Sequence, residues 1–374
     1  MENPCLTFVT PTLLAGDRSL ADVVAHEISH SWTGNVITNC TWEHFWLNEG
    51  WTVWLERKIK KEFVRRKESS TSAAEEAYAV AAQVGLAHLT GSVEHFERLK
   101  QPEYTRLVPI LEGDIDPDDV FSAVPYEKGY NLLNTLEQTV GEEKFLKILV
   151  KNYIAKFKFK TITSAEFKTF CMEECFPSGE LKSIDWDMWF FAYGMPKMPF
   201  SFTSASIAEA TTLADSWASN EEEKTEVLEK LATDTHAKWS GWITETRLVF
   251  FERLNKQMST KTSSSWSSEK LALFSTKALA GLLTTQNCEL LFQWFQLLLK
   301  TPHWKDYEGE ITKMLTSQGR MKYTRPLYRS LASADYGVAK KLFEGNRDFY
   351  HPICRNIVVK DIASFAPTTT TGTT

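Results

Sequence analysis

The spacing of two histidines near the start of the chain constrains its fold more than any other sequence feature. His26 and His30 enclose the five-residue segment His-Glu-Ile-Ser-His. This spacing places both imidazoles on one face of an α-helix, one turn apart. In that arrangement both rings can hold one zinc ion at about 2.0–2.1 Å. Glu27 lies about 100° further round the same helix, so we predict that it is the general base for a metal-activated water.

A third ligand for this ion must come from another element. Glu49, in the segment Asn-Glu-Gly, lies nineteen positions after His30, an interval that suits a helix, a turn and a returning helix. Three protein ligands leave a fourth position for water, whose pKa would fall to about 7. The alternative is a chance pattern on a surface helix, expected in about one such sequence in a thousand once the later glutamate is required. We therefore predict a single Zn2+ held by His26, His30 and Glu49.

The residues around the histidines predict a helix from about Ser19 to Trp32. Ser19 followed by Asp22 is a variant of the capping box that begins many helices. Apolar residues recur at every fourth position and should face the core: Leu20, Val24, Ile28 and Trp32.

A second helix is expected from about Phe45 to Phe63. It begins with apolar residues and ends with basic ones, as the helix dipole favours. Gly50 inside this helix costs about 1 kcal/mol relative to alanine, so we expect close packing at that point.

The chain is expected to divide into two domains and a tail. The segment 194–199, Gly-Met-Pro-Lys-Met-Pro, indicates a linker because two prolines interrupt regular structure. From about residue 206 to 363 the pattern predicts only helices with short connections, which indicates helix pairs stacked as in a solenoid. We therefore expect a first domain over 1–198, a helical domain over 199–365 and a disordered threonine-rich tail over 366–374.

Composition and charge exclude several classes of partner. A net charge of −6 and a pI near 5.9 disfavour a phosphate backbone as the main partner. The most apolar stretch, Leu290–Leu299, is ten residues long, too short to span a bilayer, and residues 1–10 lack the pattern of a secretory signal peptide. Six cysteines in 374 residues do not suggest a disulfide framework, and Cys171 with Cys175 resembles half of a structural zinc site without a second pair. We expect free thiols, no nucleic-acid or membrane partner, and a cytoplasmic location.

Three separated segments resemble the M1-type zinc aminopeptidases: residues 26–35 (His-Glu-Ile-Ser-His-Ser-Trp-Thr-Gly-Asn), 45–50 (Phe-Trp-Leu-Asn-Glu-Gly) and 318–327 (Gln-Gly-Arg-Met-Lys-Tyr-Thr-Arg-Pro-Leu). Within that family the sequence is most similar to leukotriene A4 hydrolase and aminopeptidase B. The resemblance implies a mainly α fold with a thermolysin-like (gluzincin) zinc catalytic domain in 1–198, truncated at its strand-rich N-terminal part. An α-helical, solenoid-like domain of leukotriene A4 hydrolase type follows it. The N-terminal β domain of the family is missing from this sequence, which predicts exposed apolar surface.

The resemblance also implies a role for each matching residue. His26, His30 and Glu49 match the zinc ligands, and Glu27 matches the general base. Glu2, in the segment Met-Glu-Asn, matches the glutamate that binds the free α-amino group of a peptide, a pairing of carboxylate with ammonium. From the residues alone, Glu2 would belong to a frayed terminus.

Further matches concern the substrate. Tyr126 matches a tyrosine whose phenol stabilises the tetrahedral oxyanion without adding negative charge; from the residues alone it would be a core residue at a helix start. Arg320 and Lys322 match a pair that receives the substrate carboxylate, whereas alone they would be solvated charges. Asp118 matches an acid that directs water onto a lipid epoxide and favours an N-terminal arginine.

Apolar positions bear on the choice of substrate. Trp42 and Phe45 match residues that line the substrate cavity, with ordinary core packing as the alternative. Phe121 stands where the animal epoxide hydrolases of this family have a second tyrosine, which favours a peptide over a lipid. The leading hypothesis is a zinc aminopeptidase acting on short peptides. The alternatives are an enzyme that also hydrolyses the epoxide leukotriene A4 at the same zinc, and a truncated, catalytically silent scaffold.

Overall fold

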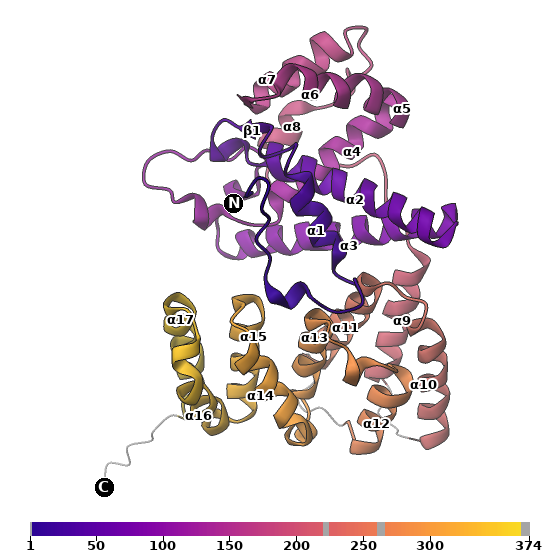
Figure 1. The fold of residues 1–374 in the computed structure, drawn as a ribbon, viewed down its shortest axis with the longest axis vertical. Coiled ribbons are helices and arrows are strands. Elements are labelled where there is room, and N and C mark those ends of the chain that lie inside the picture. Colours follow the sequence, from indigo (N-terminus) through magenta and orange to yellow (C-terminus); the bar gives the residue numbers. More distant parts are fainter. Residues whose placement is uncertain (1, 220–223, 260–265, 368–374) are drawn as a thin grey trace. The chain divides into compact units, whose positions relative to one another are not determined.

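The computed structural model describes residues 2–219, 224–259 and 266–367 (Figure 1), so the predicted tail lies outside the described residues from residue 368 on. The chain forms two compact units. The first contains residues 2–8 and Ala21–Ser204, and the second contains Val9–Leu20 and the described residues from Ala205 onward.

The division between the units follows Ser204 rather than residue 198. The segment after the predicted linker stays with the first unit because Gln83 Nε2 donates a hydrogen bond to the Phe202 carbonyl oxygen at 2.7 Å. The early segment joins the second unit through Ser19, whose Oγ accepts a hydrogen bond from Asn287 Nδ2 at 2.8 Å.

The first unit is built mainly from helices. These are α1 (Ala21–Ser29), α2 (Trp46–Glu68), α3 (Thr71–Arg98), α4 (Gly129–Val140), α5 (Glu142–Lys144), α6 (Lys151–Phe157), α7 (Ser164–Thr169) and α8 (Trp186–Phe191). Short 3-10 and π-helical turns connect them: η2 (Trp42–His44), η3 (Pro102–Thr105), η4 (Pro117–Val120), η5 (Val124–Lys128), η6 (Phe145–Val150) and η7 (Phe170–Cys175). Strands β1 (Ile37–Asn39) and β2 (Lys160–Ile162) pair in parallel, with Ile37 opposite Lys160.

Tryptophans of α2 lie at the centre of the first unit's core. Trp46 and Trp51 are buried, and Trp51 stacks on Tyr153 of α6 with ring centroids 5.1 Å apart. A Cβ added to Gly50, beside Trp51, would lie only 2.8 Å from Cα of Gly129 at the start of α4. The predicted close packing at Gly50 is therefore confirmed, because the backbones of α2 and α4 touch there.

The predicted bounds of the first helix are wrong. α1 begins at Ala21 and ends at Ser29 rather than extending from 19 to 32. Ser19 does not cap it, because its hydroxyl accepts the hydrogen bond from Asn287 instead. The second helix, α2, continues past residue 63 to Glu68, since charged residues that favour helix follow the apolar ones.

The predicted core-facing stripe on α1 is also wrong beyond Leu20. Val24, Ile28 and Trp32 are 42%, 50% and 44% exposed. The helix packs on α2 through its other side, where Ser29 is buried together with His30 directly after it. Within the described residues, the apolar side of α1 is therefore open to solvent.

The second unit consists of further helices and short turns. Its helices are α9 (Ala205–Ser219), α10 (Thr225–Trp239), α11 (Thr244–Ser259), α12 (Ser268–Ala272), α13 (Cys288–Leu298), α14 (Glu308–Ser317), α15 (Met321–Ala334), α16 (Tyr336–Asn346) and α17 (Pro352–Ala363). Its turns are η1 (Pro11–Leu13), η8 (Leu273–Ala278), η9 (Leu282–Thr284), η10 (Pro302–Tyr307) and η11 (Arg347–Phe349).

Two layers of helices make up this unit, which confirms the predicted solenoid-like architecture (Figure 1). Helices α9, α11, α13, α15 and α17 contact one another in that order and form one layer. In the other layer, α10 contacts α9 and η8, while α14 and α16 contact α15. Phe274 of η8 joins the layers, because its ring contacts the rings of Trp217, Phe250 and Trp294 from three helices of the first layer.

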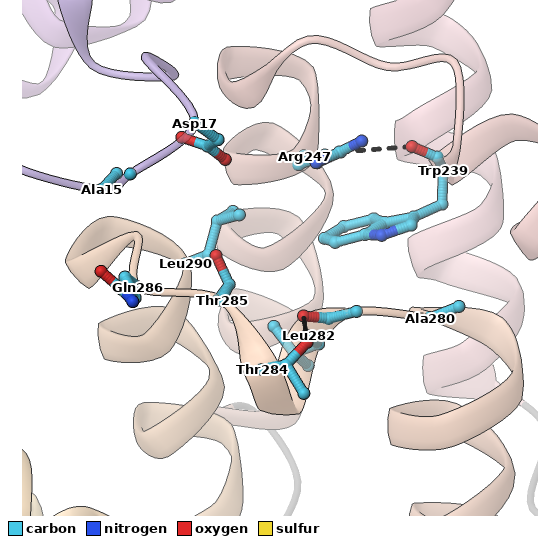
Figure 2. Close-up of a pocket in the computed structure, with 12 residues that line it drawn as sticks. Ala15, Asp17, Trp239, Arg247, Ala280, Leu282, Thr284, Thr285, Gln286 and Leu290 are labelled. Atoms are coloured by element: carbon cyan, nitrogen blue, oxygen red, sulfur yellow. Dashed lines mark hydrogen bonds between the residues drawn. The ribbon is translucent and has the colours of Figure 1, made fainter.

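A cavity of about 390 Å³ opens in the second unit (Figure 2). Arg247 on its wall donates from Nε to the Trp239 carbonyl oxygen at 3.2 Å, and its guanidinium lies 4.9 Å from the centre of the Trp239 ring. Burial lowers the pKa of Arg247, and the negative charge of Asp17 partly offsets that effect. The residues that line this cavity include none of the predicted site residues.

All six cysteines lie within the described residues and are free thiols, as predicted. Among the described helices, none combines the length and the apolar character needed to cross a membrane.

Candidate metal centre

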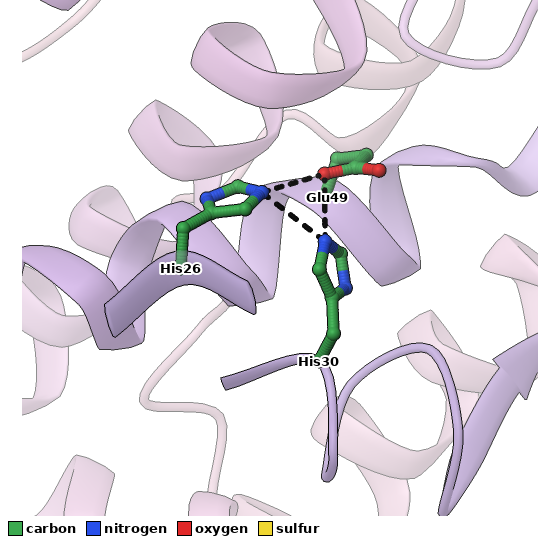
Figure 3. Close-up of side chains that lie close together, drawn as sticks. All are labelled: His26, His30 and Glu49. Carbon is green, nitrogen blue, oxygen red and sulfur yellow. Dashed lines mark hydrogen bonds and ion pairs between the residues drawn. The ribbon is translucent and has the colours of Figure 1, made fainter. Parts of the chain in front are cut away.

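The three predicted metal ligands come together in the first unit (Figure 3). His26 lies on α1, His30 directly follows that helix, and Glu49 lies in the first turn of α2. The two Nε2 atoms are 3.1 Å apart, and Glu49 Oε2 lies 3.3 Å from that of His26 and 3.5 Å from that of His30. Ligands bound to one tetrahedral ion at about 2.0–2.1 Å are about 3.3 Å from one another. The separations therefore match a zinc site.

A buried carboxylate oxygen also indicates that the site binds a metal ion. Glu49 Oε2 is buried, and among the described residues its nearest polar neighbours are the two imidazole Nε2 atoms, neither in good hydrogen-bond geometry. An unsatisfied carboxylate oxygen in the interior is costly unless a cation compensates it. Two imidazole nitrogens and this oxygen converge on one point, which suits a divalent metal that accepts nitrogen and oxygen ligands.

Local backbone geometry places His30 correctly. The His30 amide still donates to the His26 carbonyl oxygen at 3.2 Å, so the helical spacing of the two rings persists. The chain then turns back at Gly34, whose φ is +132°. A Cβ at Gly34 would lie 3.0 Å from His30 Nδ1, so this turn requires glycine.

Neighbouring groups orient both imidazoles. His26 Nδ1 lies 2.9 Å from Glu56 Oε2, and His30 Nδ1 lies 2.8 Å from the Thr33 carbonyl oxygen and 3.2 Å from Thr52 Oγ1. Partners of this kind fix the ring orientation and direct the other nitrogen at the metal.

The orienting residues Thr52 and Glu56 were not predicted from the sequence, although the sequence contains a pattern that indicates them. With Glu49 they occupy positions i, i+3 and i+7 of α2, which lie on one helix face. A second carboxylate on the face that carries a proposed ligand is the pattern that could have found Glu56.

The electrostatics of the triad favour positive charge at its centre. Burial lowers the pKa of His26, but the carboxylates of Glu49 and Glu56 outweigh it and raise the pKa to about 10. Burial raises the pKa of Glu49, but the rings of His26 and His30 lower it to about 2. Glu49 therefore stays ionised at neutral pH.

Tyr126, Glu2 and Glu27 lie around this triad. The Tyr126 ring stacks near that of His26, with centroids 6.2 Å apart. Burial raises the pKa of the Tyr126 phenol, and three carboxylates raise it further: Glu49, Glu2 and Glu27. Glu2 is half-buried, and its Cγ lies 3.4 Å from a Cβ built on Gly34, so it is not part of a frayed terminus.

Asp118, Trp42 and Phe45 line a cavity of about 450 Å³ in the first unit. Trp42 is 57% exposed, which excludes ordinary core packing for this residue. Phe121 also lines the cavity, and the ring centroid of Tyr126 lies 6.1 Å from those of Phe45 and Phe121. Tyr126 therefore lies between the metal ligands and this cavity.

Arg320 and Lys322 belong to the second unit, at the start of α15. Lys322 Nζ donates to Glu289 Oε1 at 2.6 Å, and Arg320 Nη1 lies 3.8 Å from the same oxygen. The two residues share one carboxylate and are not simply solvated charges. Their role toward a substrate carboxylate stays a prediction.

The fold and the site together define a class of metallopeptidase. Residues 1–189 match the sequence model of the Peptidase family M1 domain, so the chain belongs to that family. Residues 242–362 match the model described as Leukotriene A4 hydrolase, C-terminal. The predicted resemblance to the leukotriene A4 hydrolase branch of the M1 peptidases is therefore confirmed.

Individual relatives agree with this assignment. Over 97% of its length the chain is 39% identical to the leucine aminopeptidase 2 of Ajellomyces capsulatus and to that of Emericella nidulans, covering 54% of each. The structure of native leukotriene A4 hydrolase from Saccharomyces cerevisiae matches 97% of the chain with a TM-score of 0.84 and 34% identity, over 57% of that protein. The yeast enzyme in complex with bestatin matches with a TM-score of 0.82 and 35% identity, over the same shares. The chain thus spans about half the length of the relatives it matches.

Proposed function

We propose that this chain carries the catalytic site of a zinc aminopeptidase that removes N-terminal residues from short peptides. The convergence of His26, His30 and Glu49 beside Glu27 and Tyr126 carries the proposal. Membership of the M1 family and the similarity to leucine aminopeptidases support it. Because the chain spans about half the length of those relatives, the activity of the whole protein is part of the proposal.

Zinc held by His26, His30 and Glu49 supplies Lewis-acid activation of water and of the peptide carbonyl when it is bound. Glu27 accepts a proton from the attacking water and delivers it to the leaving amine. Tyr126 donates a hydrogen bond to the oxyanion that develops on the carbonyl. Its raised pKa keeps the phenol protonated at neutral pH, so the donor is always available.

Substrate selection follows from the groups beside the reacting bond. Glu2 binds the α-ammonium of the peptide as a charge-assisted pair and so measures one residue from the chain end. The first side chain enters the cavity next to Tyr126. Trp42 and Phe45 on its wall favour an apolar residue such as leucine, whereas Asp118 favours arginine.

Cleavage of leucyl, alanyl and arginyl anilides tests this function. The zinc-loaded chain should release the chromophore, and a chelator should stop it. Glu27→Gln should lower kcat by about 100-fold or more, in line with loss of a general base. Glu62→Gln, a surface residue of α2 with a side chain 42% exposed, should not change it. Activity that survives both chelation and Glu27→Gln would rule the mechanism out.

Epoxide hydrolysis of leukotriene A4 at the same site is a second candidate. The apolar cavity with Asp118 on its wall favours it, as does the similarity to yeast leukotriene A4 hydrolase. Asp118→Asn should abolish formation of the dihydroxy acid and spare alanyl anilide cleavage. Asp119→Asn, in the same turn but outside the cavity lining, is the matched control. Equal loss of both activities in Asp118→Asn would count against a separate lipid role.

The same measurements decide the scaffold alternative. A chain that binds one zinc ion but turns over neither peptide nor epoxide would be a catalytically silent binding protein. The observation that favours this alternative is the exposed apolar surface formed by Val24 and Ile28 of α1 and by Trp32 just after it.

A further inference from the structure

The π-helical turn η5 carries Tyr126 directly before two buried, charged residues. Glu127 and Lys128 directly follow Tyr126, and both side chains are buried. The position of the phenol therefore depends on what holds the two residues that follow it.

Glu127 is held by Arg57 of α2. Arg57 Nη2 donates to both carboxylate oxygens of Glu127 at 2.9 Å, and the guanidinium lies 4.0 Å from the centre of the Tyr130 ring. Burial lowers the pKa of Arg57, but the Glu127 charge outweighs it and raises the pKa, so the pair is ionic. Glu49 lies on the same helix as Arg57, so one rigid element carries a metal ligand and holds the turn of Tyr126.

Helix α3 leaves room for this pair. A Cβ added to Gly85 would lie 2.1 Å from Glu127 Oε2 and 2.2 Å from Arg57 Nη2. Any other residue would displace the pair, because real Cβ contacts are never that short. The packing of α2, α3 and η5 is therefore built around these two side chains.

Lys128 connects the turn to other segments of the first unit. Its Nζ donates to the carbonyl oxygens of Thr105 at 2.9 Å, Ala192 at 2.8 Å and Gly194 at 3.4 Å. The residue is only 1% exposed. It ties η5 to the end of η3 and to the segment that follows α8.

A buried ion pair is weak evidence for stability, because desolvation offsets most of the attraction and apolar residues often serve as well. What the pair supplies here is geometry, since it fixes η5 against the helix that bears Glu49. We propose that Arg57 and Glu127 are positioning residues, which hold the Tyr126 hydroxyl at its place beside the metal ligands. This inference rests on the proposed role of Tyr126 in the aminopeptidase reaction.

A double-mutant cycle with Tyr126 separates positioning from general stability. Glu127→Gln should lower kcat for leucyl anilide by about tenfold to a hundredfold, part of what losing one oxyanion donor costs, with KM and zinc content little changed. In a Tyr126→Phe background, the same Glu127→Gln change should alter kcat by less than about twofold. Arg57→Lys, which keeps a positive charge beside both oxygens of Glu127, should retain most of the parent kcat.

Glu137→Gln is the matched control. Glu137 of α4 is a buried partner of Lys58, the next residue of α2, and it also accepts from Trp54 Nε1 at 2.7 Å. Its loss should destabilise the chain to a similar degree and leave kcat within about twofold. If Glu127→Gln lowers kcat equally with and without the Tyr126 hydroxyl, or no more than Glu137→Gln does, positioning is overturned.

A readout without turnover keeps the test valid if the chain proves inactive. Chains labelled with fluorotyrosine give a 19F resonance for Tyr126, assigned by its loss in Tyr126→Phe. That resonance should be single in the parent and in Glu137→Gln, and shifted or split in Glu127→Gln. An unchanged single resonance in Glu127→Gln would overturn the inference, whereas a shift without any enzymatic activity would contradict only the proposed function.

Discussion

At the scale of single residues, the candidate metal centre depends on a carboxylate outside the three proposed ligands. Glu56 Oε2 lies 2.9 Å from His26 Nδ1 and so orients that ring. We expect Glu56→Gln to weaken zinc binding by about tenfold to a hundredfold, as loss of such a partner typically does. Competition against a fluorescent chelator measures the affinity, and Glu62→Gln, exposed on the same helix, should match the parent. Equal affinities for both variants would show that Glu56 does not orient His26.

Protons should compete with zinc for the ring nitrogen of His26. Despite burial, Glu49 and Glu56 raise the pKa of His26 to about 10, while the pKa of Glu49 is lowered to about 2. Below about pH 10, the metal-free chain therefore carries a proton on His26 that zinc must displace. The apparent zinc affinity should rise by about tenfold per pH unit between about pH 6 and about pH 8. Titration calorimetry in buffers of different ionisation enthalpy should detect one released proton, and a pH-independent affinity would contradict this.

At the scale of elements, two glycines of α3 should respond in opposite ways to the same substitution. Gly85→Ala drives a methyl group into the Arg57–Glu127 pair and should lower the free energy of unfolding by about 1–3 kcal/mol or more. Gly91→Ala meets nothing within 4 Å and should raise it by about 0.5–1 kcal/mol. Urea denaturation of both variants measures the difference. Similar changes in the free energy of unfolding of the two variants would mean that the Arg57–Glu127 pair shifts to accept the methyl group without loss of stability.

The site ligands could be predicted from sequence because their geometry is local. His26 and His30 need only one helical turn, and the fixed interval to Glu49 needs only one reversal of the chain. The Arg57–Glu127 pair could not be predicted in this way, because its members are separated by 70 positions. Gly85 is required only because a side chain there would collide with that pair, so no local sequence pattern could identify it.

The fold class and the order of helices could also be predicted from the sequence. The buried side of each helix could not always be predicted. Periodicity predicts an apolar side, yet only the neighbouring elements decide whether it is covered. Val24 and Ile28 of α1, and Trp32 just after it, stay exposed, because the helix packs on α2 through its histidine-bearing side. The boundary of the first unit shifted for a similar reason, since Gln83 binds the Phe202 carbonyl beyond the predicted linker.

At the scale of the whole molecule, this apolar side of α1 should govern solution behaviour. Exposed apolar surface promotes association, so Val24→Gln combined with Ile28→Gln should reduce self-association. The free energy of unfolding should change by less than about 1 kcal/mol, because neither side chain is buried. Leu20→Gln at a buried position should instead destabilise the chain and not improve its solubility. Sedimentation velocity at several concentrations tests this, and unchanged association in the double variant would exclude this surface as its cause.

The same helix has a consequence for how the molecule loses its metal. α1 spans nine residues and is packed on one side, and helices of that length are marginal without support. An ion bound to His26, His30 and Glu49 would link α1 to α2. Binding of the metal would then be thermodynamically coupled to the folding of α1. Hydrogen exchange should therefore show residues 21–30 protected with zinc and rapidly exchanging without it, while α4 stays unchanged. A chelator would then act on this protein first as a local denaturant, and only through that as an inhibitor.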